Sequence, residues 1–282
     1  MTPRTALLTA VAMVAFATNS LLCRAALGAE RIDAASFASV RVISGAVALL
    51  VILALRDRRP ALPKADWRMV AALFAYVAFF SFAYIWLSAG TGALLLFGAV
   101  QLTMFAVALH GGERFTALSW VGFAAALLGL VWLVAPGVTA PDAIGAALMV
   151  VAGIAWGAYS LLGRGAADPL AATASNFAHA VPLVAVVSLV FWRDFDISAR
   201  GVALAVVSGA LASGCGYVIW YAALRGLTAT RAATVQLSVP AIAALGGVLL
   251  ISEELTLRLM VGSAATIGGV AMVLSQRAAK RV

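Results

Sequence analysis

Acidic side chains, which most often carry acid–base and metal chemistry, lie outside the long apolar runs of this chain. All eleven Asp and Glu residues fall in loops or near the ends of those runs. The sequence has no HExxH pattern, no carboxylate pair inside a run and no Cys–His cluster at metal-ligand spacing. His110 precedes two glycines at a turn, and His179 has no ligand partners nearby in sequence. We therefore predict no enzyme, no metal site and no cofactor.

Arg41 is a cation about a third of the way into the apolar run at 33–55. A charge in hydrocarbon is costly and usually marks a functional site. We expect the Arg41 side chain to snorkel toward the outer headgroups; pairing with a substrate carboxylate is the alternative. Because no carboxylate lies deep in a run, we predict a polar but uncharged site for zwitterionic or amphipathic solutes, with facilitated movement or weak ion coupling.

Aromatic and uncharged polar side chains inside the runs are the remaining candidates for a binding site. Tyr76, Phe80 and Tyr84 are four residues apart and share one helix face. Polar groups in lipid need a partner, which is either a substrate or a neighbouring helix. Packing against neighbours is thus the alternative for each candidate. The residues that we predict to bind a substrate are Phe16, Asn19, Tyr76, Phe80, Tyr84, Gln101, Trp156, Tyr159, Tyr217, Trp220, Gln236 and Ser238.

The runs that carry these residues are typical of an all-α integral membrane protein. The chain has 282 residues, of which 64% are hydrophobic and 11% charged, and its mean hydropathy is +1.06. Such a chain has too little polar surface to fold in water, so the lipid bilayer is its solvent. A transmembrane helix needs about 20 apolar residues. The ten predicted transmembrane helices are 5–24, 33–55, 67–87, 91–109, 115–134, 142–163, 170–192, 200–222, 228–251 and 256–275.

Positive charge is distributed unevenly over the connections between these helices. Thirteen Lys and Arg residues fall at the ends and loops on the side of the N-terminus, and five on the other side. Cytoplasmic loops are enriched in these residues, so we predict a bacterial inner-membrane protein with both termini in the cytoplasm. The net charge of +8 has the same explanation, and we predict no nucleic-acid partner.

An internal repeat divides the chain into two parts. Residues 20–27 match 160–167 at five of eight positions, and 113–129 match 253–269 at seven of seventeen, both at an offset of 140. Gln101 corresponds to Gln236 at an offset of 135. Five helices per repeat is an odd number, so the second repeat must be inverted. We predict two inverted five-helix repeats, 1–138 and 139–282, around a central cavity that works by alternating access.

Each repeat places a Glu-x-x-Thr start, at Glu113 and Glu253, before a last helix with spaced glycines. This pattern resembles the drug/metabolite transporter superfamily, EamA type, and the aromatic residues are most similar to those of YddG-type amino-acid exporters. One departure is a proline after Gln236 in the ninth helix, Pro240, with none after Gln101 in the fourth. An equal kink in both halves is therefore not expected.

The resemblance implies a secondary transporter that exports small metabolites, amino acids with aromatic or other neutral side chains among them, with broad selectivity. Helices one, three, four, six, eight and nine would line its cavity. Phe16 aligns with Trp156 and Asn19 with Tyr159 at the 140-residue offset, so each pair would face the cavity together. Export of drugs, nucleobases or other metabolites is the alternative, as is a channel or a membrane assembly protein without transport activity.

Small residues at regular spacing predict where helices approach closely. Gly122 and Gly129 are seven residues apart in the fifth helix, as are Gly262 and Gly269 in the tenth. Faces of small residues let helix backbones come near each other. We expect this contact to lie within a monomer; a dimer through these two helices is the alternative.

Overall fold

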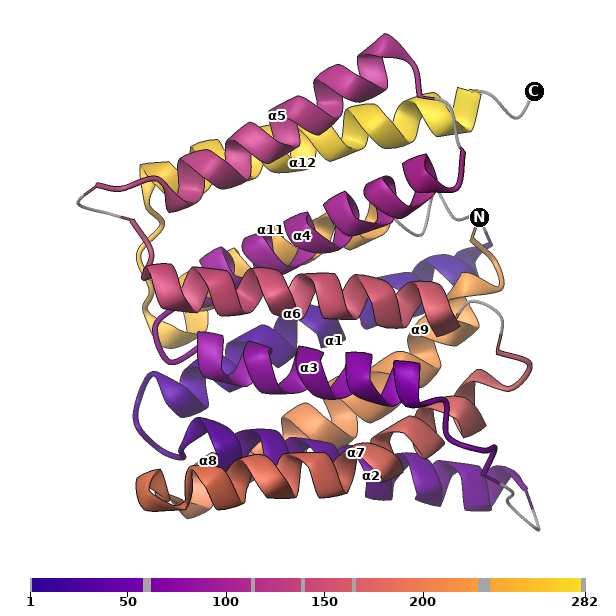
Figure 1. Ribbon diagram of the computed structural model, residues 1–282, viewed down its shortest axis with the longest axis vertical. Helices are drawn as coiled ribbons and strands as arrows, with labels where there is room; N and C mark the ends of the chain where they lie inside the picture. The colour runs from indigo at the N-terminus through magenta and orange to yellow at the C-terminus, as the bar shows by residue number, and fades with distance from the viewer. Residues whose placement is uncertain are drawn as a thin grey trace.

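A computed structural model describes residues 2–57, 62–112, 115–137, 140–163, 166–227 and 234–279, with side chains up to residue 273. The described chain is a bundle of helices with one isolated bridge, between Ile32 and Ile197. The helices lie alongside one another in stacked layers, and both termini are at the same end (Figure 1). The predicted domain boundary at 138/139, the residues Glu113 and Arg164, and the start of the ninth predicted helix at 228 lie outside the described residues.

The helices follow the predicted runs closely along the chain. One predicted run, at 67–87, gives a shorter helix, because the chain turns from Tyr84 to Leu87 before the next helix starts. The run at 200–222 holds three consecutive helical segments, the middle one a π-helix. In order, the helices are α1 Pro3–Leu27, α2 Ala34–Arg56, α3 Trp67–Ala83, α4 Ala89–His110, α5 Ala117–Val134, α6 Ala143–Leu162, α7 Pro169–Val190, η2 Trp192–Asp194, α8 Ala199–Val206, η3 Val207–Cys215, α9 Gly216–Leu224, α11 Ser238–Ile251 and α12 Leu257–Ala279.

Side-chain caps determine where most of these helices begin. The first backbone N–H groups of a helix have no partner inside it, and an oxygen at the preceding residue can accept one of them. Several carboxylates near run ends have this role, which accounts for acidic residues at the membrane boundary. The capping residues whose side chains accept a backbone N–H are Thr2, Asp33, Asp66, Ser88, Thr116, Asp142, Asp168 and Ser198.

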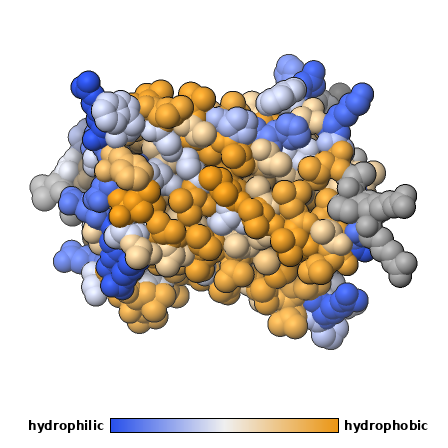
Figure 2. All heavy atoms as spheres, turned by 90° about the horizontal axis from the view of Figure 1, so that it is seen from below, coloured by the Kyte–Doolittle hydropathy of each residue, from blue (hydrophilic) through white to orange (hydrophobic). Residues whose placement is uncertain are grey.

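Eight described helical stretches are long and apolar enough to cross a membrane, when Ala199–Leu224, which joins α8, η3 and α9, and Thr234–Ile251, which includes α11, are each counted as one. Two more predicted spans coincide with shorter apolar helices, Trp67–Ala83 and Leu257–Val273. Apolar side chains form a band between two hydrophilic ends of the molecule (Figure 2). Large apolar residues such as Leu128 and Leu249 are 66% and 79% exposed, which is stable only against lipid. Tryptophans with exposed fractions of 46–64% lie near helix ends, as interfacial anchors do: Trp67, Trp120, Trp132 and Trp192.

The pair α5 and α12 is held together by the spaced glycines. A Cβ at Gly122 would lie 2.5 Å from the carbonyl oxygen of Gly269, and a Cβ at Gly262 would lie 3.3 Å from that of Gly129. These two contacts pair the start of each helix with the later part of the other, so the helices run antiparallel. Between them, Thr266 Oγ1 donates to the carbonyl of Ala126 at 3.5 Å. The close approach predicted for these helices therefore occurs within one chain.

The fourth and ninth predicted helices differ as the single proline indicates. The helix α4 is continuous from Ala89 to His110. In the ninth, a helical turn ends at Gln236, Leu237 forms a turn and α11 begins at Ser238. Pro240 has no N–H to donate to the carbonyl four residues earlier, that of Gln236, so the helix breaks there.

We expect Gly269→Ala to destabilise the protein and Gly268→Ala to leave its stability unchanged or raise it. A Cβ at position 269 would lie 2.4 Å from the carbonyl oxygen of Gly122, whereas nothing lies within 4 Å of a Cβ at the neighbouring position 268. The first change should force the helices apart and destabilise the protein by about 1–3 kcal/mol. The second should leave the midpoint of thermal unfolding in detergent unchanged or raise it, since alanine is the better helix former. Equal effects at both positions would contradict the packing of α5 on α12.

Candidate functional site

A small cavity lies at the centre of the bundle, where α1, α3, α4, α6 and α9 meet. The space that the centre of a water molecule can occupy inside it is about 10 Å³, so the cavity has room for about one water. Six of the predicted substrate-binding residues line it, together with two residues of α4 that the sequence analysis missed, Leu96 and Phe97. The full lining is Phe16, Asn19, Tyr76, Phe80, Leu96, Phe97, Trp156 and Tyr217.

Aromatic rings build most of the cavity wall. The ring of Phe16 meets the edges or faces of three others, with centroid distances of 6.2 Å to Trp156, 6.0 Å to Tyr217 and 5.8 Å to Trp220. Trp156 also lies against Tyr76 at 4.8 Å. Edge-to-face pairs of this kind add stability beyond the burial of apolar area. The predicted partners Phe16 and Trp156 are thus brought together, and we call these five rings the aromatic cage.

The hydroxyl of Tyr76 is the polar centre of this wall. It accepts a hydrogen bond from Asn19 Nδ2 at 3.2 Å and one from Arg41 Nη2 at 3.0 Å. Asn19 in turn accepts from the Ser208 hydroxyl through its Oδ1 at 2.5 Å. All four residues are buried, so in a medium without water each bond satisfies a group that would otherwise be costly.

Arg41 does not snorkel, and that expectation is wrong. Its side chain is fully buried, with 0% exposure. The guanidinium lies over the rings of Phe80 and Tyr76, 4.8 and 5.2 Å from their centroids, and its Nε donates to the Ser213 hydroxyl at 3.2 Å. Ring faces and hydroxyl acceptors partly replace the hydration that the cation loses. A positive charge therefore borders a site that was predicted to be uncharged.

The π-helix η3 supplies two serines that the sequence analysis missed. Ser208 bonds Asn19 and Ser213 accepts from Arg41. At about 100° per residue, positions five apart would point about 140° from each other on an α-helix. Hydrogen bonds from i to i+5 in a π-helix bring such positions closer to one face. The only sequence signal was Ser-x4-Ser, which is uninformative unless the π-helix is known.

Two predicted residues, Tyr159 and the cage ring Trp220, contact lining residues without lining the cavity themselves. Tyr159 stacks on Trp156 at 5.6 Å, and its hydroxyl accepts from Asn176 Nδ2 at 3.3 Å. Trp220 contacts Phe16 but does not line the cavity. Counted from the aspartate caps of α2 and α7, Asp33 and Asp168, both Arg41 and Asn176 are eight residues along. The buried position that holds a cation in α2 thus holds a neutral amide in α7.

The last four predicted residues do not line the cavity. Tyr84 caps α3 and is fully buried near the end of the bundle, where its ring lies on Phe80 at 4.8 Å. Gln101 and Gln236 are buried in α4 and just before α11. Ser238 is exposed, and its hydroxyl donates to the carbonyl of Val235 at 2.7 Å.

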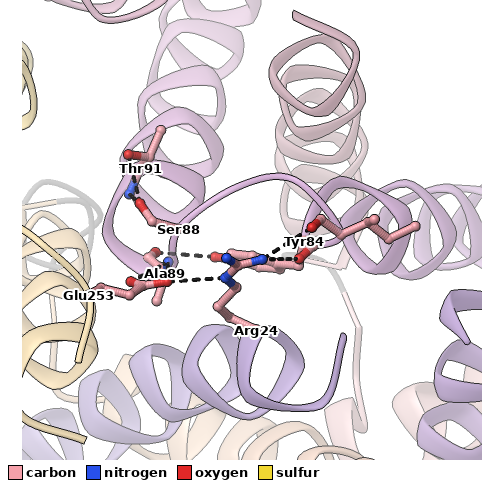
Figure 3. A network of polar contacts seen from close by, with 7 residues as sticks. Arg24, Tyr84, Ser88, Ala89, Thr91 and Glu253 are labelled. Carbon is pink, nitrogen blue, oxygen red and sulfur yellow. Dashed lines mark hydrogen bonds and ion pairs between the residues drawn. The ribbon is translucent and has the colours of Figure 1, made fainter. Parts of the chain in front are cut away.

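At the end of the bundle opposite the termini, an ion pair that the sequence analysis missed joins Arg24 to Glu253 (Figure 3). Glu253 accepts from Arg24 Nε at 3.2 Å and from the backbone N–H of Ala89 at 2.9 and 3.1 Å. Arg24 Nη1 also donates to the carbonyls of Tyr84 and Ile85. This network, which we call the Arg24–Glu253 clamp, joins the end of α1, the connection between α3 and α4, and the loop before α12.

At the end that holds the termini, the charged contact is of a different kind. Arg56 at the end of α2 donates to both Asp57 and Asp168, the cap of α7. These hydrogen bonds lower the pKa of both carboxyl groups. The side chains are 38–42% exposed, so solvent screens the pair and its contribution to stability is small.

Comparison with known proteins gives a consistent family. Residues 3–135 and 143–275 each match the model described as the EamA-like transporter family. An uncharacterised protein of Pseudomonas aeruginosa is 53% identical over 278 residues, which cover 98% of this chain and 96% of that protein. An uncharacterised transporter of Archaeoglobus fulgidus is 26% identical, over 82% of this chain and 84% of that protein. One solved crystal structure resembles this fold with a TM-score of 0.66 at 17% identity, covering 99% of this chain and 100% of that one.

We expect Tyr76→Phe to destabilise the protein by about 1–3 kcal/mol, because Arg41 Nη2 and Asn19 Nδ2 would both lose their buried acceptor. Tyr84→Phe, at the C-terminal end of the same helix, is the matched control. The Tyr84 hydroxyl makes one long bond, of 3.4 Å to the carbonyl of Ala89, so its loss should cost less than about 1 kcal/mol. Thermal unfolding of the purified variants measures both. A smaller loss for Tyr76→Phe than for Tyr84→Phe would contradict its role as the polar centre.

Proposed function

The chain belongs to the EamA-like transporter family, and on that premise we propose that it exports small metabolites, amino acids first, across the bacterial inner membrane by alternating access. It is a multi-pass membrane protein of a family of transporters rather than of enzymes. The observation that carries the proposal is the aromatic cage at the centre of the bundle. Its apolar walls with few polar groups are typical of small-molecule sites.

Two inverted halves, 1–138 and 139–282, and ten membrane crossings are part of this proposal. The two family matches begin and end 140 residues apart, the offset found in the sequence. Adding 140 to Gly122 and Gly129 gives Gly262 and Gly269, so the contact of Gly122 with Gly269 and that of Gly129 with Gly262 are exchanged by the repeat. An antiparallel pair of equivalent helices is what an inverted repeat requires. The shorter apolar helices, α3 and the first part of α12, would complete the ten.

The cavity lies where the two halves would meet. Equivalent residues of the first helix in each half, Phe16 and Trp156, contact each other there. Inverted repeats place substrate sites at such an interface near the membrane midplane. Aromatic rings provide stacking surfaces, and Asn19 with the hydroxyls of Tyr76 and Tyr217 provides polar contacts. This combination favours amino acids with aromatic or other neutral side chains over drugs or nucleobases.

Alternating access explains why the cavity is small and one end is clamped. Room for about one water is too little for a solute, so binding requires the helices around the cage to separate. The Arg24–Glu253 clamp would hold the end away from the termini closed in this state. Since the terminal end carries more Lys and Arg, we place it in the cytoplasm and the clamp at the outer face.

We predict that the purified protein in proteoliposomes carries a saturable flux with counterflow for at least one member of a panel of amino acids, nucleobases and drugs. Trp156→Ala should reduce this flux at least about tenfold, because one buried aromatic contact of a ligand is worth about 1.4 kcal/mol or more. Gln236→Ala tests whether the buried amide before α11 also takes part. Trp132→Ala is the matched control, since that ring is 52% exposed and should leave flux unchanged.

Flux that does not saturate would point to a channel instead. Absence of flux for the whole panel would contradict the transport proposal. Equal flux in wild type, Trp156→Ala and Gln236→Ala would place the binding site elsewhere.

We predict that Glu253→Gln opens the outer end, because it removes the charge that binds Arg24 and the Ala89 N–H. A cysteine at the cavity residue Phe97, in a chain whose native cysteines are replaced, reports the opening through its reaction with a membrane-impermeant thiol reagent added outside. The labelling rate should rise several-fold. Glu254→Gln is the matched control, because Glu254 is the exposed neighbour. Equal rates in the two variants would show that the ion pair does not close this end.

A further inference from the structure

Arg41 is a buried cation without an anion. Its side chain is fully buried, and among the described residues no carboxylate lies within 4 Å of it, since the ion pairs found there involve only Arg24 and Arg56. Its contacts are two neutral hydroxyls and two ring faces. Charges inside membrane proteins usually have a counter-charge or carry out a function, and an unpaired buried charge is strongly destabilising. A group that costs stability in this way requires an explanation.

Donors without acceptors identify where an anion would sit. Three buried side-chain polar atoms have no hydrogen-bond partner in the described part of the chain: Ser20 Oγ, Arg41 Nη1 and Tyr217 Oη. Nη1 carries two N–H groups without an acceptor. A guanidinium binds the two oxygens of a carboxylate through one N–H from each of two nitrogens, so Nη1 and Nη2 would form this fork once Nη2 no longer donates to Tyr76. Tyr217 lines the cavity, and its hydroxyl can donate one hydrogen bond to a bound carboxylate. Orphan groups of this kind usually point to a missing partner.

The path from the cavity to Arg41 is short. Tyr76 and Phe80 line the cavity on one side and contact the guanidinium on the other. The Tyr76 hydroxyl thus lies between the cavity and the guanidinium, where it accepts hydrogen bonds from Arg41 and Asn19. A carboxylate adds the attraction of opposite charges to the hydrogen bond, so it binds a guanidinium more strongly than a neutral hydroxyl does. When the cage opens for a solute, a carboxylate would displace the Tyr76 hydroxyl from Arg41.

We propose that Arg41 binds the carboxylate of the transported solute, while the aromatic cage holds its apolar part. This rests on the proposed transport function and names the substrate class more closely: organic monoanions and amino acids, bound by their carboxylate. No acidic residue lines the cavity, so an ammonium group finds only uncharged acceptors, on Asn19, Tyr76 and Tyr217, and ring faces. A cation without a carboxylate is repelled by Arg41. Asn176, at the corresponding position of α7, is neutral, so of these two positions only that of Arg41 carries a charge.

Four probes with the same phenyl group test this assignment: 3-phenylpropionate, phenylalanine, 3-phenylpropionamide and phenethylamine. Binding is measured by thermal stabilisation of the purified protein, and flux in proteoliposomes. For wild type we expect 3-phenylpropionate to bind at least about tenfold more tightly than its amide, and phenethylamine to bind weakest. Arg41→Gln should bring the ratio of acid to amide affinity close to one, and Arg41→Lys should keep part of it. Arg193→Gln, at an exposed arginine, should leave the ratio unchanged.

Equal affinity of wild type for the acid and the amide would overturn the assignment, as would an unchanged ratio in Arg41→Gln. If neither Arg41 variant folds, the ratio of acid to amide affinity in wild type tests the assignment by itself. Loss of the acid preference on adding chloride, with no acid flux, would assign Arg41 to an inorganic ion and overturn it as well. Flux of acid and amide alike would support transport and contradict the role of Arg41. Acid binding that depends on Arg41, without flux of any probe, would support the site and contradict transport.

Discussion

Lipid offers no hydrogen bonds, so every polar group inside this bundle has to be satisfied by another part of the chain. The rest of the structure follows from that requirement. Hydroxyl and carboxylate caps satisfy the first N–H groups of the helices at the membrane boundary. In the interior, the hydroxyl of Tyr76 connects Asn19 and Arg41 into one network. The π-helix η3 adds the two serines that complete the network.

The centre of the bundle combines near-symmetric packing with an asymmetric charge. Phe16 and Trp156, at equivalent places in the sequence, meet across the cavity. Behind them, Arg41 and Asn176 are equally far from their aspartate caps, yet one bonds Tyr76 and the other Tyr159. Aromatic rings therefore line the cavity near both positions, whereas of the two residues Arg41 and Asn176 only Arg41 carries a charge. A solute that binds such a site would have one preferred orientation.

The two ends of the bundle are closed by contacts of different strength. The Arg24–Glu253 clamp is partly buried, with side-chain exposures of 26% and 14%, and includes backbone groups of the connection between α3 and α4. The pair of Arg56 and Asp168 at the other end is 41–42% exposed, so water and salt weaken it. This difference distinguishes the two ends of the bundle, whereas the break of the ninth predicted helix before Pro240 distinguishes that helix from the continuous α4.

From the amino-acid sequence we could predict the all-helical membrane architecture, the helix positions, the family and most of the aromatic residues that line the cavity. These follow from hydropathy, capping residues and spacing, which act over a few residues of chain. Only the tertiary structure showed that Arg41 is buried, because its environment comes from α3 and η3, far away in sequence. The same holds for Ser208 and Ser213, whose shared face depends on a π-helix, and for Leu96 and Phe97, which no pattern distinguishes from other apolar residues. The clamp also joins Arg24 to a residue 229 positions away. Local chemistry predicts which elements form, whereas the partners of a buried polar group depend on how those elements pack.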